Sequence, residues 1–128
     1  MTKLFSPRDD DQERILSSLL HLTVEQRISW AHIEDHGDAY YVAIGGHEYT
    51  LRSEDGDGVA PFRLLIEDAN GHGPNFMIKS HLRDGTVENE TASRLLTELY
   101  EEVSGGQYDN AMSDLLEELD SAKEPPSL

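Results

Sequence analysis

The stretch that most restricts the fold is AYYVAIGGHEYTLR, residues 39–52, in which a Gly-Gly pair separates two alternating segments. The apolar residues that recur at every second position are Tyr40, Val42, Ile44, Tyr49 and Leu51. Such alternation is typical of strands that bury one face and expose the other. Gly45-Gly46 can adopt the positive φ angles that a two-residue hairpin loop requires. The sequence therefore predicts an antiparallel β-hairpin.

Two more strands are predicted downstream of this hairpin. FRLLIED, residues 62–68, alternates in the same way, and FMIKSHL, residues 76–82, is a shorter strand. The segments between the strands, SEDGDGVAP and ANGHGPN, are rich in the Gly, Pro, Asp and Asn residues that form turns. Strands joined by short turns predict an antiparallel meander of three to four strands.

Helices are predicted on both sides of the sheet in the sequence. Gln12 to Leu22 has a helical apolar stripe, and residues 9–11 place three aspartates at its N-terminus. A second stripe runs from Leu95 to Val103, with Thr91 as the N-cap and Gly105-Gly106 as the end of the helix. A third stripe, in a separate helix, comprises Ala111, Met112, Leu115, Leu116 and Leu119. The predicted class is α+β, with the N-terminal helix and two C-terminal helices packed on one face of the meander.

Residues 24–33, VEQRISWAHI, fit two structures equally well. Val24, Ile28 and Ala31 have helical spacing, whereas Ile28, Trp30 and His32 would share one face of a strand. At 128 residues the chain suits a single domain, residues 1–128. We expect a folded core over about residues 10–121, with frayed tails at residues 1–8 and 122–128.

Composition excludes several classes of protein. The chain has no cysteine, so it lacks disulfides, a thiolate nucleophile and any cysteine-based zinc site. The N-terminus is charged where a signal peptide is apolar, and no apolar run reaches membrane-spanning length. We therefore expect a cytoplasmic protein without a membrane partner.

Three features of the sequence together resemble a known pattern. They are the leading helix with Trp30, the strand sequence HEYTLRSEDG and the C-terminal sequence LLTELYEEVSGGQYDNAMSDLLEEL. The chain resembles a group of small, acidic, uncharacterised bacterial proteins. That pattern combines a leading helix, a tryptophan, an antiparallel sheet, a helix of the form LxELYExA and a closing helix of the form DxAMxxLLEEL. The resemblance covers roughly residues 12 to 120, supports the same fold, and implies no catalytic or binding residues.

The charge balance is the most unusual property of the composition. Ten basic residues against 26 acidic residues give a formal net charge of −16. A surface of this sign repels nucleic acid and anionic membranes, so we expect no direct nucleic-acid binding. Acidic residues dominate the C-terminal helices, where the candidate partner surface comprises Glu98, Glu101, Glu102, Asp109, Asp114, Glu117 and Glu118. This surface is either a solvated helix face or a docking surface for a basic protein.

A metal site is the first chemical candidate. The potential ligands near the hairpin are His32, Asp35, His36, Asp38 and His47. The HIEDH sequence spaces His32 and His36 as a zinc-protease motif does, but Glu34 stands one position too late. In a strand the two histidines would lie about 13 Å apart, at about 3.3 Å per residue, so one metal could not bridge them. We assign no metal ligand here and expect exposed hairpin histidines.

The other chemical patterns are weaker. SEDGDG and EDANGHG resemble calcium loops, but each places an apolar residue at the twelfth position, which requires a bidentate glutamate. Gly45-Gly46 joins two strands, whereas a phosphate-binding loop joins a strand to a helix. Ser29 or Ser80 could be combined with a histidine and an acid, but no nucleophile-elbow motif accompanies either serine. We therefore predict no catalytic residue and no cofactor.

These observations favour a non-catalytic protein that acts through protein–protein interaction, as an adaptor, inhibitor or regulator of a basic partner. Two alternatives stay open. One is a nucleic-acid mimic that blocks a DNA- or RNA-binding protein, and the other is a metal-dependent enzyme that uses the His32/His36 region. The sequence does not specify the oligomeric state.

Overall fold

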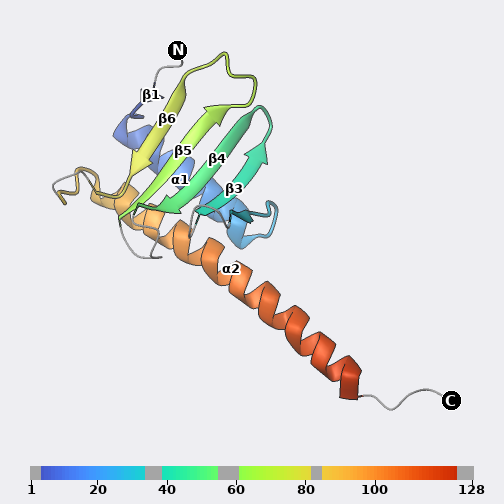
Figure 1. The fold of residues 1–128 in the computed structure, drawn as a ribbon. Coiled ribbons are helices and arrows are strands. Elements are labelled where there is room, and N and C mark those ends of the chain that lie inside the picture. The colour runs from blue at the N-terminus through green and yellow to red at the C-terminus, as the bar shows by residue number, and fades with distance from the viewer. Residues whose placement is uncertain (1–3, 34–38, 55–60, 82–84, 124–128) are drawn as a thin grey trace.

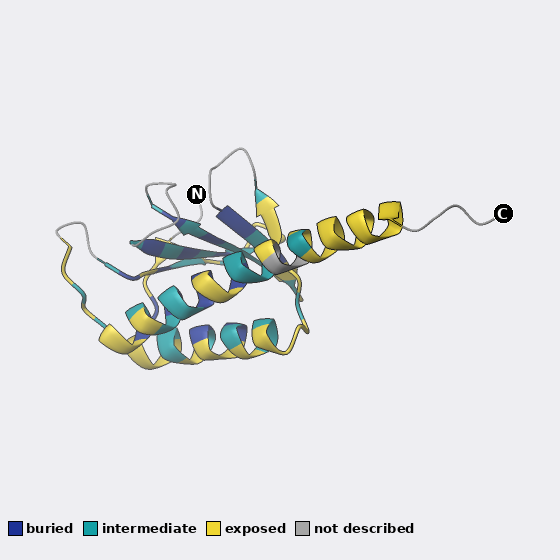
Figure 2. Ribbon diagram, turned by 90° about the horizontal axis from the view of Figure 1, so that it is seen from below, coloured by how far each residue is buried: buried dark blue, intermediate teal, exposed yellow. Residues whose placement is uncertain are grey.

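The computed structural model describes residues 4–33, 39–54, 61–81 and 85–123 of the chain. Within these ranges the elements follow in the order β1 (Leu4–Phe5), α1 (Asp9–Val24), β2 (Ala31–Ile33), β3 (Ala39–Ile44), β4 (His47–Ser53), β5 (Phe62–Asp68), β6 (Asn75–Lys79) and α2 (Glu90–Lys123). The protein is α+β, as the sequence predicted, and both helices lie on the same face of one sheet (Figures 1 and 2).

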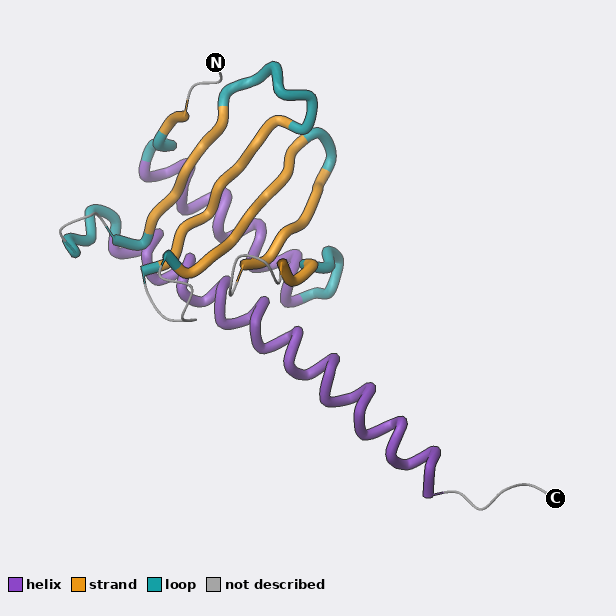
Figure 3. Tube along the Cα trace, in the orientation of Figure 1, coloured by secondary structure: helices purple, strands orange, loops and turns teal. Residues whose placement is uncertain are grey.

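The sheet is mixed and has six strands in the order β1-β6-β5-β4-β3-β2 (Figure 3). Its centre is the predicted antiparallel meander β3 to β6. The prediction of three to four strands was wrong, because β2 pairs with β3 at one edge and β1 pairs in parallel with β6 at the other. These edge strands contain only three and two residues, too few for alternation to be detected in the sequence.

The hairpin has the geometry that its glycines predicted. Ile44 pairs with His47 across a two-residue loop, and Gly45 has φ +61°. A positive φ at the first loop position is the property of type II′ turns, which match the twist of the flanking strands. The register then aligns Tyr40 with Leu51 and Val42 with Tyr49 on the face that the helices cover.

The ambiguous residues 24–33 contain the end of a helix, a turn and a strand. Helix α1 ends at Val24, and Gln26 has φ +58°, which turns the chain back toward the sheet. The indole nitrogen of Trp30 donates a hydrogen bond to Thr23 Oγ1 at 3.0 Å, which fixes this turn against the helix end. Strand β2 begins at the next residue, Ala31.

The hydrophobic core lies between the two helices and the covered face of the sheet. Its fully buried members are Leu16 of α1, Leu51, Leu64 and Ile78 of the sheet, and Leu96 and Leu99 of α2. Tyr100 of α2 packs its ring against Phe62 at 4.3 Å between centroids and against Tyr40 at 5.7 Å. The core therefore contains the apolar stripe of α1 and the buried residues of α2 as far as Val103. At 3.6 residues per turn, the apolar residues 108–119 of α2 lie on roughly the opposite side of the helix from those buried residues.

The two predicted C-terminal helices are one helix of 34 residues, which corrects the predicted break at Gly105-Gly106. A glycine inside a helix costs about 1 kcal/mol relative to alanine, and the helix formers Leu, Glu, Ala and Met in residues 95–102 and 111–119 offset that cost. The start of the helix also differs from the prediction. Asn89, and not Thr91, is the N-cap, since its Oδ1 accepts a hydrogen bond from the Ala92 N–H at 3.0 Å.

The C-terminal part of α2 extends beyond the sheet into solvent (Figures 1 and 2). Among the side chains of α2 that the structure describes, Val103 is the last that is buried. We call residues 108–123 the arm. The structure does not describe the side chains of residues 107, 109 and 110. The predicted third helix is therefore not packed on the sheet, because the core is already filled by the first half of the same helix.

The continuity of α2 predicts that Gly106→Ala stabilises the protein. A Cβ at this position meets no atom within 4 Å, and φ is not positive, so alanine raises the free energy of unfolding by about 0.5–1 kcal/mol. Gly45→Ala is the control and lowers stability, because its φ of +61° strains an alanine. Denaturant unfolding measures both variants. Destabilisation by Gly106→Ala would show that the helix ends there.

The core predicts that Leu96→Ala costs about 2–5 kcal/mol of unfolding free energy, because a fully buried leucine leaves a cavity. Val24→Ala, at a position that is 55% exposed, serves as the control and changes stability by about 0.5 kcal/mol or less. Urea titrations followed by far-UV circular dichroism compare the two. Equal effects would contradict the assignment of the buried face of α2.

Candidate functional site

The acidic residues expected to form a partner surface all belong to α2. Glu101 and Glu102 are exposed near the sheet, and Asp114, Glu117 and Glu118 are exposed on the arm. Asp109 also lies in the helix, but its side chain is outside the described residues. Glu98 is half-buried and accepts a hydrogen bond from Arg94 Nη1 at 3.3 Å, so its charge is paired within the helix. The candidate surface therefore concentrates on the arm.

The arm combines these acids with an exposed apolar stripe. Tyr108, Leu115, Leu116 and Leu119 are 64%, 46%, 52% and 50% exposed. At 3.6 residues per turn they share one side of the helix with the half-buried Met112. Glu118 and Asp120 border this stripe on its two sides, whereas Asp114 and Glu117 lie on the opposite side. The arm is thus an amphipathic helix whose apolar side has no covering element in the described part of the chain.

The potential metal ligands considered in the sequence are not brought together in the residues that the structure describes. His32 lies on β2, where its ring contacts Tyr40 at 5.2 Å between centroids. His47 begins β4, two strands away in the sheet order. Asp35, His36 and Asp38 are outside the described residues. Across residues 4–33, 39–54, 61–81 and 85–123, no three His, Asp or Glu side chains gather as metal ligands.

The serines considered for catalysis have structural roles or no histidine partner. Ser80 Oγ lies 2.8 Å from His81 Nδ1, but it also accepts the Phe62 N–H at 2.8 Å and is only 2% exposed. These bonds close the end of the β5–β6 pair and remove the hydroxyl from solvent. Ser29 is exposed before β2, and no described histidine forms a hydrogen bond with it.

Asp68, in the second calcium-like loop, accepts hydrogen bonds from backbone N–H groups of its own turn. Asp68 Oδ1 accepts the Asn70 N–H at 3.2 Å, and Oδ2 accepts the Gly73 N–H at 2.5 Å. A Cβ at residue 73 would lie 2.8 Å from Asp68 Oδ2, so any larger residue there would displace this carboxylate. The backbone hydrogen bonds from Asn70 and Gly73 lower the pKa of Asp68 below 3.8. The first such loop falls mostly in residues 55–60, outside the described part.

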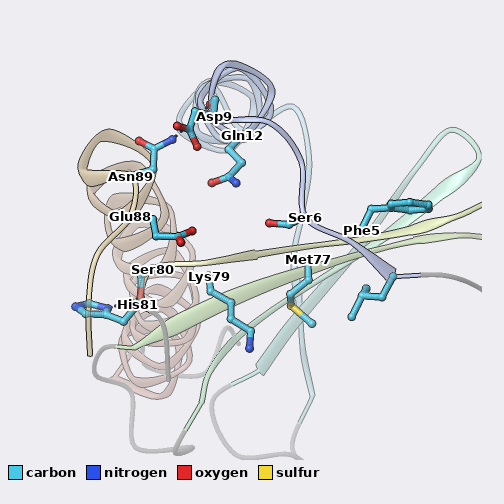
Figure 4. Close-up of a pocket in the computed structure, with 11 residues that line it drawn as sticks. Phe5, Ser6, Asp9, Gln12, Met77, Lys79, Ser80, His81, Glu88 and Asn89 are labelled. Carbon is cyan, nitrogen blue, oxygen red and sulfur yellow. Dashed lines mark hydrogen bonds between the residues drawn. The ribbon is translucent and has the colours of Figure 1, made fainter. Parts of the chain in front are cut away.

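Two hollows flank the N-terminal half of α1. One, of about 240 Å³, opens beside β1 and β6, near the N-termini of both helices (Figure 4). Its polar groups already serve the helix starts: Gln12 donates to the Pro7 carbonyl at 2.7 Å, and Asn89 donates to the Asp9 carbonyl at 3.5 Å. The other, of about 440 Å³, is an apolar groove lined by Ile15, Leu19, Leu22, Ile44, Tyr49 and Phe76.

The fold and these surfaces define an α+β protein with a one-sided helical layer and a projecting amphipathic arm. Comparison of the chain with protein-family models, curated protein sequences and solved structures finds no match. Among the described residues, no helix is both long enough and apolar enough to cross a membrane.

The Asp68 turn predicts a carboxyl pKa below the ordinary value of 3.8. Because the folded-state pKa is lowered, ionised Asp68 stabilises the fold above about pH 4, and this contribution is lost as the pH falls through the lowered pKa. Carboxyl-carbon NMR of the folded protein measures the titration directly. Acid unfolding of Asp68→Asn, compared with the wild type, isolates the same contribution. A pKa at or above 3.8 would contradict the turn geometry.

Proposed function

We propose that this protein is a non-catalytic adaptor, inhibitor or regulator that binds a basic protein partner through the arm. The observation that supports this proposal is that an exposed apolar stripe and exposed acids lie together on one projecting helix. Burying leucine side chains supplies affinity, at about 25 cal/mol per Å² of apolar surface. Acids around the stripe select a partner of opposite charge and accelerate its association.

The apolar stripe favours a protein partner over the role of nucleic-acid mimic. A mimic needs carboxylates spaced as phosphates, and leucines that are about half exposed add nothing to such a surface. An amphipathic helix that lies in the groove of another protein uses anchors at the spacing of residues 108, 112, 115, 116 and 119. We further propose that the protein belongs to the small acidic group that its sequence resembles.

The arm predicts which substitutions abolish partner capture. The full-length protein is immobilised and exposed to an extract of its native host. The wild type should retain a basic protein, and the Leu116→Asp variant should fail to retain it. Glu118→Lys with Asp120→Lys, at the borders of the stripe, should weaken retention by about a hundredfold, since each of the two reversed contacts costs about 1.4 kcal/mol. Quantitative mass spectrometry of the retained proteins measures the loss.

The matched control is Asp114→Lys with Glu117→Lys, which makes the same change in charge on the opposite side of the same helix. This variant should retain the partner nearly as well as the wild type. Equal loss in both double variants would mean that only net charge matters, and retention unaffected by Leu116→Asp would overturn the proposal. A retained protein that free DNA or RNA competes away would favour mimicry instead.

A further inference from the structure

The apolar residues of the arm recur at alternating intervals of four and three residues. They are Tyr108, Met112, Leu115, Leu119 and Ala122. This spacing is that of the a and d positions of a coiled-coil heptad, with Met112 and Leu119 at a and the other three residues at d. Leu116 then takes position e, beside the same seam. All the exposed large apolar residues of the arm that the structure describes therefore lie in or next to one a/d seam.

The charged residues of the arm have a matching arrangement. Asp114 is at position c, Glu117 at f and Asp120 at b, and these positions point away from a partner helix in a coiled coil. Glu118 is at g, on one border of the seam, and Lys123, the single basic residue of the arm, is at e, on the other border. Within the described part of the chain, neither Glu118 nor Lys123 forms an ion pair.

Two parallel copies of the arm pair these border charges with each other. In a parallel two-stranded coiled coil, a residue at g faces the residue at e of the following heptad in the partner helix. For Glu118 that residue is Lys123, five positions further along the chain. The contact forms twice by symmetry, and the same rule places Ala111 beside Leu116 one heptad earlier. An antiparallel pair brings g toward g and e toward e, so it loses both ion pairs.

The position of the arm leaves room for this contact. At 3.6 residues per turn, the seam lies on roughly the opposite side of α2 from the buried residues Leu99 and Val103. A second arm therefore approaches from the side away from the core, and the sheets of the two copies lie on opposite sides of the two-fold axis. The arm itself stands clear of the sheet (Figures 1 and 2). The seam ends above Tyr108, because position d one heptad earlier is the exposed Glu101.

The seam is short, but its helix is already formed. An isolated helix as short as the arm is marginal in water, because nucleation is unfavourable. Helix α2 begins in the core, where Leu96 and Leu99 are fully buried, so the arm continues an existing helix. A straight helix drifts by only about 20° per heptad from the seam, so a seam of this length stays on one side without strong supercoiling. Association therefore joins two preformed surfaces.

We infer that the arms of two copies of this protein associate as a parallel two-stranded coiled coil. Leu115 and Leu119 of both copies pack in the seam, and Glu118 of each copy faces Lys123 of the other. This inference rests on the proposed function for one point: the second copy covers the stripe that a foreign partner would use. Dimerisation then regulates partner binding by competition. The dimer itself follows from the arm alone.

A single introduced cysteine tests the alignment, because the chain has no cysteine of its own. Ala122→Cys, at d, faces its own copy in the parallel dimer, where the Cα atoms lie within the roughly 7 Å that a disulfide can span. Oxidation of the full-length protein should give a covalent dimer on a non-reducing gel. Ser121→Cys, at the outward position c, is the control and should stay monomeric. In an antiparallel pair the two copies of residue 122 lie about 20 Å apart, so no cross-link forms.

Sedimentation over a dilution series measures the strength of the dimer. The wild type should reach the mass of two chains as the concentration rises, and Leu115→Asp should stay monomeric. Glu118→Lys or Lys123→Glu alone should weaken dimerisation by about tenfold over the two contacts. An equimolar mixture of these two variants should regain it, because each border charge then faces its opposite. Glu117→Lys, at the outward position f, repeats the charge change of Glu118→Lys and should dimerise as the wild type does.

Three outcomes would overturn the inference: a wild type that stays monomeric at every concentration, equal cross-linking of Ala122→Cys and Ser121→Cys, or a mixture that does not regain association. Far-UV circular dichroism checks the fold of each variant.

The cross-linked dimer separates the inference from the proposed function. Oxidised Ala122→Cys should retain a foreign partner less well than the same protein after reduction. Equal retention by the two forms would refute the competition and the proposed use of the stripe, while the dimer would stand. A monomeric wild type whose arm variants still lose a foreign partner would refute the dimer and leave the proposed function standing.

Discussion

The packing of the first half of α2 against one face of the sheet determines the rest of the molecule. Tyr100 stacks on Phe62 at 4.3 Å and meets Tyr40 edge-on, while Leu96 and Leu99 are fully buried beside it. Such aromatic pairs add about 0.5–1.5 kcal/mol each to the burial of their surface. Once α1 and this half of α2 fill the covered face, no core surface is left for the remaining turns of α2. The arm, and the face of the sheet that the helices leave uncovered, are therefore both consequences of the same one-sided core.

The sequence predicted the elements whose signal is local. The hairpin was predictable because alternation and Gly45-Gly46 both lie within one short segment, and the single register that buries Leu51 follows from it. The edge strands β1 and β2 were missed, because they form only where tertiary contacts hold two or three residues beside a longer strand. The predicted end of a helix at Gly105-Gly106 was wrong. A glycine pair lowers helix stability but does not terminate a helix that strong helix formers continue.

The candidate site was predictable in part for the same reason. The acids and leucines of the arm follow one another along a single helix, so their spacing is visible in the sequence. The alignment of Arg52, Arg63 and Lys79 was not predictable, because these residues come from three strands and meet only through the register of β4, β5 and β6. Each occupies a polar position of an alternating strand, where a lone basic residue is unremarkable. Only the alignment of the strands brings these three basic residues together in one row.

Net charge and local charge act on this molecule at different distances. A formal charge of −16 repels a second copy at long range, but at physiological ionic strength that repulsion is screened beyond about 8 Å. Contacts between a carboxylate and a basic side chain act within about 4 Å and are strengthened when leucines exclude water around them. Salt therefore weakens both the attraction between a carboxylate and a basic side chain and the long-range repulsion between the net charges. A basic surface on an otherwise acidic protein is therefore distinguished by its local charge, which the overall net charge does not reveal.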